Sequence, residues 1–419
     1  MEKGKMMKRR VVITGMGGLS PLGNTVPEMW ENARNGVCGI DYIKSFDTSL
    51  MKVKVAGELK NYHPEDHMDK MSARRTARFT QLALVAARQA MEQSGLDMEK
   101  EDRTRCGVNI SSGIGGLPTI EEEHTKGEKR GFDRVSPLFV PMAITNMAAG
   151  MVAIEHGFQG SCQCIVTACA SGTNAIGEAF RQIAGGYADI FLTGGAESCV
   201  SPLGIGGFTS MKALSESEDP LRASIPFDAE RNGFVMGEGA GVLVLEEYEH
   251  AVKRGAEILG EVCGYGVSCD ANHMTAPLED GSGAARCMKL ALEDAGIAPA
   301  EIAYINAHGT STPMNDRCET KAVRLALGDA ADRVKLSSTK SMTGHLLGAS
   351  GAVEAIFTVS ALRDRFAPPT AGYKVPDPAC DLDIVANEGK SFDGEYAMSN
   401  SLGFGGHNAS CLLYTSRCV

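Results

Sequence analysis

Short buried apolar runs alternate with amphipathic helical segments along almost the whole chain. This alternation is typical of an α/β protein with largely parallel, buried sheets. The strand candidates are residues 10–14, 105–111, 189–195, 241–245, 257–267, 302–306 and 335–338, and the helix candidates are residues 79–92, 246–254 and 283–295. The sequence therefore predicts an α/β fold.

One arrangement occurs twice in the chain. An apolar strand, a turn of small residues and an alanine-rich helix describe both residues 165–181 and residues 336–362. This repetition predicts an internal duplication, in which two similar α/β units each bring chemistry to equivalent strand ends. We expect the first unit to span residues 1–254 and the second to span residues 255–419.

Composition limits the class of protein. The 419 residues are 43% hydrophobic and 22% charged, which fits an ordinary globular protein with a large core. The net charge of -11 argues against a general nucleic-acid binder. The 13 cysteines lack the paired spacing of a zinc ribbon, so reduced thiols in the cytosol are the favoured interpretation.

The N-terminus superficially resembles a signal peptide, because basic residues 1–10 precede an apolar run at residues 11–19. Glycines interrupt that run and no cleavage pattern follows, so we interpret it as a first strand that ends in a turn. No later apolar run approaches the roughly 20 residues that span a bilayer. The sequence predicts a cytosolic protein without membrane contact, with frayed ends at residues 1–7 and 415–419.

Cys169 lies where an apolar run passes into a helical pattern, within the motif TACASGT. A thiol there is close to the unpaired N–H groups and the positive end of the helix, which favour the thiolate. The same N–H groups could hold an oxyanion. The alternative is that Cys169 is a small buried core residue, which is the commoner fate of a free cysteine.

Three stretches of the second half are rich in polar residues and glycine: NAHGTSTP at residues 306–313, residues 337–345, and residues 400–408. His308 and His345 each follow a predicted strand. Glycines in the third stretch would let the backbone approach a substrate closely. Two histidines in such positions, together with a cysteine at a helix start, favour a catalytic site.

Other motifs carry less weight. The run Gly15–Gly18 departs from the dinucleotide-binding spacing, so we predict a bare turn, and Gly233–Gly241 lacks the ending that grips phosphate. Ser337 and Lys340 match an S-x-x-K pattern whose companion motifs are absent. The polar stretch 121–134 is interpreted as a surface excursion, and the run Glu121–His124 within it is interpreted as a solvated acidic face and not as a metal site.

Together, the motifs TACASGT, NAHGTSTP, SSTKSMTGHLLGASGAVE and GFGG resemble those of the β-ketoacyl-[acyl-carrier-protein] synthases, a family of thiolase-like condensing enzymes, and in particular the elongating enzymes of bacterial type II fatty-acid synthesis. The similarity runs from Val11 to about Leu413. The resemblance implies a thiolase-like, duplicated five-layered α-β-α-β-α fold and a homodimer. It also implies no metal and no cofactor, because the substrates are carried on the phosphopantetheine arm of acyl-carrier protein.

The resemblance implies a decarboxylative Claisen condensation of an acyl-enzyme with malonyl-[acyl-carrier protein], which gives 3-oxoacyl-[acyl-carrier protein]. In this reaction Cys169 is the nucleophile that holds the acyl chain as a thioester. His308 and His345 donate from Nε2 to the malonyl thioester carbonyl while carbon dioxide leaves. The backbone N–H groups of Cys169 and Phe404 hold the oxyanion, and Phe404 gates the two pockets.

Further residues receive roles from the same resemblance. Lys340 holds the histidine side of the site, and we place Glu354 among the substrate-binding residues and expect it to pair with Lys340. The remaining candidates are Thr275, Thr310 and Thr312 for the phosphopantetheine arm, Ile114 and Phe139 for the wall of an acyl tunnel, and Arg74, Arg75 and Lys212 for docking of the acidic carrier. Core packing is the alternative for the tunnel residues, and unpartnered surface charge is the alternative for the docking residues.

Other functions stay open at this point. His407 stands where the family has a small hydroxylated residue, and we assign it no catalytic role. A polyketide-type ketosynthase or a thiolase would share the fold, although two histidines plus a lysine favour malonyl decarboxylation. A non-catalytic chain-length partner subunit would be expected to lack Cys169, and a serine hydrolase built on Ser337 is the least favoured alternative.

Overall fold

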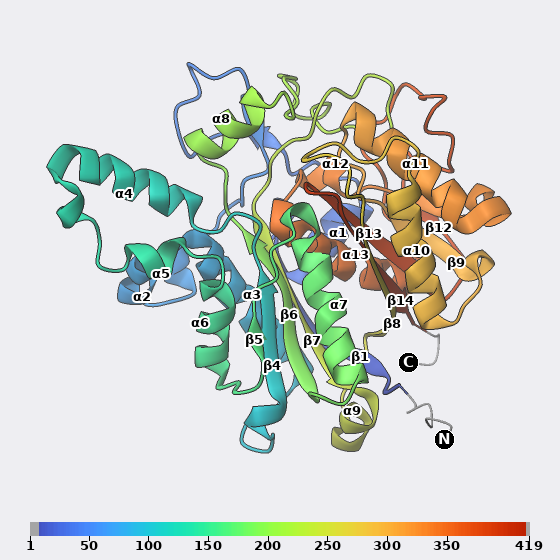
Figure 1. The fold of residues 1–419 in the computed structure, drawn as a ribbon, viewed down its shortest axis with the longest axis horizontal. Helices are drawn as coiled ribbons and strands as arrows, with labels where there is room; N and C mark the ends of the chain where they lie inside the picture. Colours follow the sequence, from blue (N-terminus) through green and yellow to red (C-terminus); the bar gives the residue numbers. More distant parts are fainter. Residues whose placement is uncertain (1–7, 416–419) are drawn as a thin grey trace.

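The computed structural model describes residues 8–415, so residues 1–7 and 416–419 of the ends that we expected to fray lie outside it. Thr415, which we also expected to fray, is buried, and its N–H donates to the Glu395 carbonyl at 3.1 Å. The main feature of the structure is a ten-stranded mixed sheet in the order β10-β9-β13-β14-β8-β1-β7-β6-β4-β5 (Figure 1). The first half of the chain supplies β1 (Val11–Leu19), β4 (Cys106–Ser111), β5 (Cys162–Gln163), β6 (Ile190–Glu197) and β7 (Gly239–Glu247). The second half supplies β8 (Gly260–Cys269), β9 (Ile302–Asn306), β10 (Lys335–Ser337), β13 (Tyr396–Gly403) and β14 (His407–Tyr414).

Both halves have the same topology. If the five strands of each half are numbered in chain order, their spatial order is 1-5-4-2-3 in both. The neighbouring pairs are antiparallel, antiparallel, parallel and parallel in each half. This repeat is the duplication that the sequence predicts. The boundary at residue 254/255 itself stays a prediction; α9 (Tyr248–Arg254) ends there, and Gly255 caps it in the left-handed conformation.

Helices cover both faces of the sheet and fill the space between the halves. The outer helices are α3 (Arg78–Ser94) and α6 (Met147–His156) on the first half, and α10 (Ser282–Ala295) and α11 (Pro313–Leu327) on the second. The central pair is α7 (Ser171–Ala184) and α13 (Ser350–Asp364), which contact each other and strands of both halves. The result is the five-layered α-β-α-β-α arrangement implied by the resemblance.

Apolar cores lie between these layers. In β7, Leu243 and Leu245 face the central core formed by α7 and α13, whereas Val242 and Val244 face the outer core beneath α3. Successive side chains of a strand point to opposite faces, so a strand with helices on both sides must be apolar at every position. This is why the strands appear in the sequence as continuous apolar runs.

The glycines of β1 correct one expectation. Gly15–Gly18 does not form a bare turn, because β1 continues to Leu19. A Cβ on Gly15 would lie 2.1 Å from the carbonyl oxygen of Ala90, and one on Gly17 would lie 1.9 Å from that of Ala86. Helix α3 therefore packs on the strand at a distance that only glycine permits.

The two halves of the sheet join at β1 and β8, where Val11–Ile13 pairs with Gly260–Val262. The strand expected at the start of residues 165–181 is replaced by a shorter and earlier one, the edge strand β5. The stretch 121–134 is mostly helical but stays at the surface, as α4. Among residues 8–415, no helix combines the length and the apolar character needed to cross a membrane.

The other elements are short or peripheral. They are α1 (Val26–Arg34), α2 (Lys70–Arg75), α4 (Leu117–Arg130), α5 (Phe139–Ala143), α8 (Pro202–Ser210), α12 (Lys340–Thr343), β2 (Asp41–Tyr42), β3 (Val55–Ala56), β11 (Phe366–Ala367) and β12 (Lys390–Ser391). Seven 3₁₀ turns complete the described part of the chain. Two of them, Ala168–Ala170 and Leu347–Ala349, lead directly into the central helices and shape the candidate site.

Candidate active site

Cys169 is the middle residue of the 3₁₀ turn Ala168–Ala170, which leads directly into α7. Ala168 has a φ of 50°, an uncommon conformation for a residue with a side chain. The Ser171 hydroxyl stabilises the turn, because it accepts from the Thr167 N–H at 2.9 Å and donates to the Ala168 carbonyl at 2.6 Å. The position of Cys169 is therefore set by the backbone.

The charge state of Cys169 differs from the sequence-based expectation. Burial raises the pKa of its thiol to about 12, against the opposing effects of Lys340 and of the backbone N–H groups of Phe404 and Cys169 itself. Glu197 adds to the rise in pKa. Desolvation outweighs the helix end here, so the resting group is the thiol. The two N–H groups that we predicted to hold an oxyanion both lie at the sulfur.

His308 follows β9 by two residues, and His345 lies in the turn after α12; each is 2% exposed. Their ring centroids are 5.3 Å apart, with the ring planes at 85°. Burial lowers the pKa of both imidazoles well below the ordinary value, and the positive charge of Lys340 lowers both further. Both histidines are therefore neutral at pH 7.

The imidazoles retain free hydrogen-bonding atoms. His345 Nδ1 lies 2.8 Å from the Ser350 hydroxyl at the start of α13. Within residues 8–415, buried His345 Nε2 and buried His308 Nδ1 have no hydrogen-bond partner. His345 Nε2 is the atom that we predicted to donate to substrate, whereas the buried unpaired atom of His308 is Nδ1 and not the predicted Nε2.

Two buried carboxylates at the site escaped the sequence analysis. Glu319 in α11 accepts the backbone N–H groups of His308 and Gly309, both at 2.8 Å, and burial raises its pKa to about 7. Glu197 ends the apolar strand β6, and a charged residue directly after such a run was the signal that could have found it. Glu319 gave a weaker signal, because a glutamate in a helix is usually exposed.

Lys340 and Glu354 form a buried ion pair behind the histidines. They are 1% and 3% exposed, and Lys340 Nζ donates to Glu354 Oε1. The pairing confirms that prediction. The prediction that Glu354 binds substrate is wrong. Glu354 is enclosed by protein behind the site and is not among the described residues that line the cavity, so it is not placed to bind substrate directly.

Phe404 lies in the hairpin that joins β13 to β14. Gly405 and Gly406 have φ values of 86° and 76°, which explains why the loop needs glycine there. The Phe404 ring lies 6.3 Å from that of Phe208, centroid to centroid. His407 begins β14 opposite Gly403 and is not among the described residues that line the cavity.

A cavity of about 350 Å³ brings most of the predicted site together. Its lining includes Cys169, His308, His345, Phe404, Thr275, Thr310, Thr312 and Lys212. The aromatic rings of Phe208 and Phe234 form part of the wall, and Phe234 packs edge-on against His345 at 5.3 Å. Residues from both halves of the chain therefore face one enclosed space.

Four predicted residues lie elsewhere. Among the described residues, the cavity lining does not include Ile114 or Phe139; Ile114 packs against the same apolar cluster as Phe208, and Phe139 begins α5. Arg74 and Arg75 are exposed on α2, which Figure 1 shows well apart from α8, the helix that precedes Lys212. Within the described chain neither Ile114 nor Phe139 lines the cavity, so the wall of the predicted tunnel stays a prediction.

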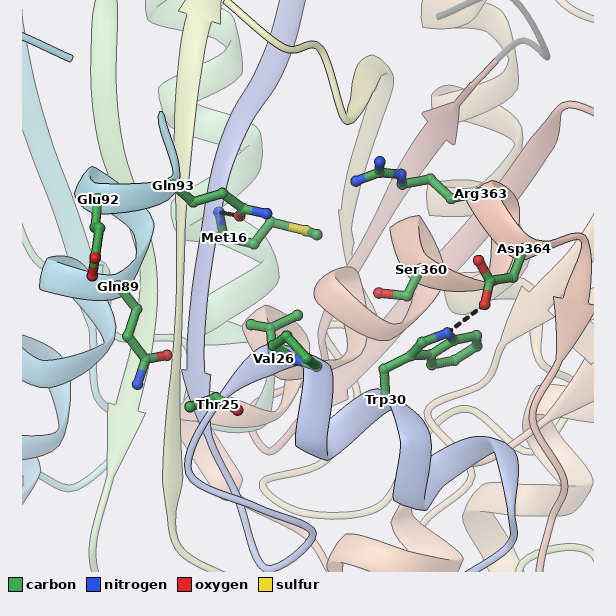
Figure 2. Close-up of a pocket in the computed structure, with 11 residues that line it drawn as sticks. Met16, Thr25, Val26, Trp30, Gln89, Glu92, Gln93, Ser360, Arg363 and Asp364 are labelled. Carbon is green, nitrogen blue, oxygen red and sulfur yellow. Dashed lines mark hydrogen bonds between the residues drawn. The ribbon is translucent and has the colours of Figure 1, made fainter. Parts of the chain in front are cut away.

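A second cavity, of about 590 Å³, lies between α1, α3 and α13 (Figure 2). Trp30 Nε1 donates to Asp364 at 2.8 Å there, and Gln93 accepts the Met16 N–H at 2.7 Å. The residues that line it, all within 8–415, include no cysteine or histidine. In the same part of the chain, no group of three or more His, Cys, Asp or Glu side chains is arranged to hold a metal ion. The candidate chemistry is therefore at the smaller cavity.

Comparisons with known proteins agree with this geometry. Residues 8–251 match the model of the beta-ketoacyl synthase N-terminal domain, and residues 259–374 match that of the C-terminal domain. The chain is 54% identical over 401 residues to 3-oxoacyl-[acyl-carrier-protein] synthase 2 of Staphylococcus aureus (strain COL), covering 96% of this chain and 97% of that protein. It is 48% identical over 404 residues to the protein of the same name from a Synechocystis species, with coverage of 96% and 97%.

Solved structures give the same result. A ketosynthase structure that contains a type II polyketide acyl-carrier protein and a bound hexaketide matches with a TM-score of 0.91 and 37% identity, covering 98% of this chain and 100% of that one. A beta-ketoacyl synthase from Burkholderia phymatum matches with a TM-score of 0.89 and 34% identity, with the same coverage. The fold is the thiolase-like fold of ketosynthases, and the chain belongs to the beta-ketoacyl synthase family.

Proposed function

We propose that this protein is an acyltransferase of fatty-acid chain elongation, which condenses an acyl-enzyme with malonyl-[acyl-carrier protein]. The observation that carries the proposal is the shared cavity: the Cys169 thiol and two neutral imidazoles, His308 and His345, face the same space. The name of the Staphylococcus aureus relative, 54% identical over nearly the whole length, points to the same reaction.

In the first half-reaction, Cys169 sulfur attacks the thioester carbonyl of the acyl donor. The carbon–sulfur bond to the carrier breaks, and the proton of the thiol passes to the carrier's sulfur, so an acyl-enzyme and a free carrier thiol result. The N–H groups of Cys169 and Phe404 lie at the sulfur, where they hold the negative oxygen of the tetrahedral intermediate.

In the second half-reaction, the malonyl group loses carbon dioxide and an enolate remains. His308 and His345 donate hydrogen bonds to the enolate oxygen, which carries more negative charge than the ground-state carbonyl did. Donation by the Ser350 hydroxyl to His345 Nδ1 places the imidazole proton on Nε2, the buried atom without a partner in the described chain. The low pKa of both groups keeps them neutral donors and not cations.

The carbon–carbon bond forms when the enolate carbon attacks the acyl-cysteine carbonyl. The oxyanion of the tetrahedral intermediate accepts hydrogen bonds from the same two N–H groups. The intermediate then collapses, and the bond between the acyl carbon and Cys169 sulfur breaks. The 3-oxoacyl chain then rests on the carrier, and Cys169 takes a proton from water. The high pKa of the thiol favours this last step.

The same proposal includes the carrier and its arm. Thr275, Thr310 and Thr312 line the cavity, and the hydroxyls of the last two lie 2.9 Å apart, a polar strip suited to the amides of phosphopantetheine. Lys212, whose side chain has no partner in residues 8–415, stands at the same cavity for an acidic carrier, with Arg74 and Arg75 as more distant contacts. We infer no further cofactor, because the reaction needs none beyond the arm.

We also propose a homodimer in the cytosol. β5 is the edge strand of the large sheet, and exposed apolar side chains lie around it: Val140, Ile144, Ile154 and Val166. Figure 1 shows that α5, α6 and β5 occupy one side of the molecule. An apolar edge of this kind favours pairing with a second copy. All twelve described cysteines are free, which suits a reducing compartment.

A polyketide-type ketosynthase is the second candidate, supported by the TM-score of 0.91 to the ketosynthase with a bound hexaketide. A non-catalytic chain-length partner is disfavoured by Cys169 in its formed turn. The two catalytic candidates differ in their primers: a fatty-acid enzyme extends saturated acyl chains in preference to 3-oxoacyl chains, and the reverse preference would support the polyketide function.

Intact-mass analysis after incubation with an acyl-[acyl-carrier protein] tests the proposal. The wild type and the matched control Cys164→Ala should gain one acyl group, whereas Cys169→Ala should gain none. An acyl group on Ser337, or labelling that persists in Cys169→Ala, would contradict the assignment. Addition of malonyl-[acyl-carrier protein] should then release carbon dioxide and remove the label from the enzyme.

A further inference from the structure

Glu197, the last residue of β6, is 0% exposed and accepts six hydrogen bonds. Oε1 accepts from Ser112 Oγ at 2.8 Å, Ile114 N at 3.3 Å, Gly115 N at 3.2 Å and Cys199 Sγ at 3.3 Å. Oε2 accepts from Gly113 N at 2.7 Å and Gly348 N at 3.0 Å. Only donors surround the group, as a buried carboxylate requires.

Cys199 is two residues from Glu197 in the chain, but the other five donors come from segments that are far from it in the sequence. Ser112 to Gly115 form the turn after β4 in the first half, and Gly348 lies in the 3₁₀ turn that starts α13 in the second half. Glu197 is therefore a polar connection between the two halves. Each bond to a charged acceptor is stronger than a neutral one, so the carboxylate fixes both segments.

The nucleophile turn lies at the same junction. A Cβ built on Gly113 would be 2.9 Å from Glu197 Oε2, 3.3 Å from Gly348 N and 3.4 Å from the Ala168 carbonyl oxygen. The turn that carries Cys169 and the turn that follows His345 thus meet at Gly113. The space there allows no side chain.

His345 depends on the Gly348 turn for its orientation. Gly348 follows it by three residues, and Ser350, two residues further, holds His345 Nδ1 at 2.8 Å. Leu347 has a φ of 47°, a conformation that a leucine adopts only when its surroundings hold it. A displacement of the Gly348 N–H group would therefore move Ser350, two residues further along the chain, and with it the His345 imidazole that Ser350 holds.

We propose that Glu197 is a positioning residue of the condensing site, which acts through the Gly348 turn on His345. The inference rests on the proposed function and deepens it. The hydrogen bonds of Glu197 go to neither the thiol nor the imidazoles, so its effect falls mainly on the step that His345 serves, malonyl decarboxylation. Acyl transfer to Cys169 depends on Ser171 and the α7 turn and is affected less.

Glu197→Gln tests this proposal, because it keeps the shape but places an NH₂ group against backbone N–H donors. Malonyl decarboxylation should fall about tenfold to a hundredfold, while acyl transfer changes by less than about threefold, since small misplacements of a catalytic group have effects of this size. Alkylation of Cys169 by iodoacetamide should shift to lower pH in the variant, because one negative charge near the thiol is lost.

Glu246→Gln is the matched control. Glu246 is also a glutamate at 0% exposure, but it lies at the opposite end of the β6–β7 pair, since Ile190 pairs with Glu246 and Glu197 with Gly239. Its partners are Thr14, His250 and Arg254. This control should lower stability without changing the ratio of the two half-reactions.

Ser112→Ala is a second variant that removes one donor from Glu197 and keeps the proposal testable if Glu197→Gln does not fold. It should lower the decarboxylation-to-acylation ratio in the same direction by about threefold, the value of one net hydrogen bond. An equal fall in both half-reactions in the folded variants, or the same split in Glu246→Gln, would overturn the inference. A wild type that performs neither half-reaction would instead overturn the proposed function.

Discussion

The two 3₁₀ turns that lead into the central helices have nearly the same backbone conformation but different residues at their centre. Ala168–Ala170 and Leu347–Ala349 each begin with a left-handed non-glycine residue, at φ 50° and 47°. Each is followed by a helix that opens with Ser-Gly, at Ser171 in α7 and Ser350 in α13. The middle residue is Cys169 in the first turn and Gly348 in the second.

What faces the middle residue differs as well. Gly403 ends β13 beside the first turn, where a Cβ would lie 3.3 Å from the Cys169 N–H nitrogen. Glu197 ends the equivalent strand β6, and its carboxylate accepts the Gly348 N–H at 3.0 Å. The N–H group of Cys169 is therefore available to an oxyanion, whereas the N–H group of Gly348 already donates to the Glu197 carboxylate. In the proposed reaction the first turn serves the chemistry and the second turn serves positioning.

The supports behind the two turns should differ in strength. Lys340→Met leaves the Glu354 carboxylate buried without its partner, which should lower the free energy of unfolding by about 3–5 kcal/mol. Behind the first turn, Asn174 makes neutral hydrogen bonds to Thr167 and Tyr265, both at 2.6 Å, so Asn174→Ala should cost about 1–3 kcal/mol. Urea denaturation measures both. A smaller loss for Lys340→Met than for Asn174→Ala would reverse the ranking.

The histidines should separate the two half-reactions. His308→Ala and His345→Ala should each reduce malonyl decarboxylation by about a hundredfold to a thousandfold, because each removes one donor from the enolate. Acyl transfer to Cys169, followed by intact mass, should persist. Release of carbon dioxide from malonyl-[acyl-carrier protein] is the measurement. Undiminished decarboxylation in either variant would contradict the role proposed for that histidine.

A side chain at residue 403 should block the free N–H group of Cys169, so that this group, like that of Gly348, is no longer open to a ligand. In Gly403→Ala, the new methyl group would lie 2.6 Å from the Thr167 carbonyl oxygen and 3.3 Å from Cys169 N. Acyl transfer should fall about tenfold to a hundredfold through displacement of the turn. Gly207→Ala, at a glycine whose Cβ would meet nothing within 4 Å, is the matched control. Equal rates for the two variants would show that the amide does not take part.

The smallest expected effect concerns a histidine outside the site. His250 lies between Glu246 and Glu101, at 2.6 Å and 2.9 Å, and the hydrogen bond to Glu246 raises its pKa, unlike the pKa of the two buried site histidines. Its stabilising effect is fully present below the unfolded pKa of about 6.5 and is lost as pH rises through the higher folded pKa. The stability difference between wild type and His250→Gln should therefore be larger at pH 6 than at pH 9. A constant difference would contradict the charged state.

Much of the fold could be predicted from the sequence because local patterns determine it. The strand at Ile302–Asn306 matches its prediction, and α3 covers the predicted helix at residues 79–92 and is capped by Gly95 in the left-handed conformation. The glycines of β1 were interpreted wrongly, because their reason is the closeness of α3, which lies some 70 residues away in the chain. Contacts of that range leave no local pattern.

In the candidate site, too, the features with a local sequence motif could be predicted and those that depend on distant contacts could not. Cys169, His308 and His345 have distinctive motifs, and the structure brings them to one cavity. The protonation of Cys169 could not be predicted, since the helix end is local but desolvation depends on the whole fold. Glu197 gave little signal for the same reason: its six donors become neighbours only after folding. Ile114 and Phe139 remain predictions, because neither is among the described residues that line the cavity.

The short joint between β1 and β8 has a consequence for protein engineering. Only three residue pairs connect the two halves of the sheet there within the described chain, compared with eight between β13 and β14. The halves are therefore natural units for exchange between related enzymes. A hybrid would need to match the partner at this joint, along the packed faces of α7 and α13, and at the Glu197 carboxylate. Such a hybrid would inherit its nucleophile from one parent and its imidazoles from the other.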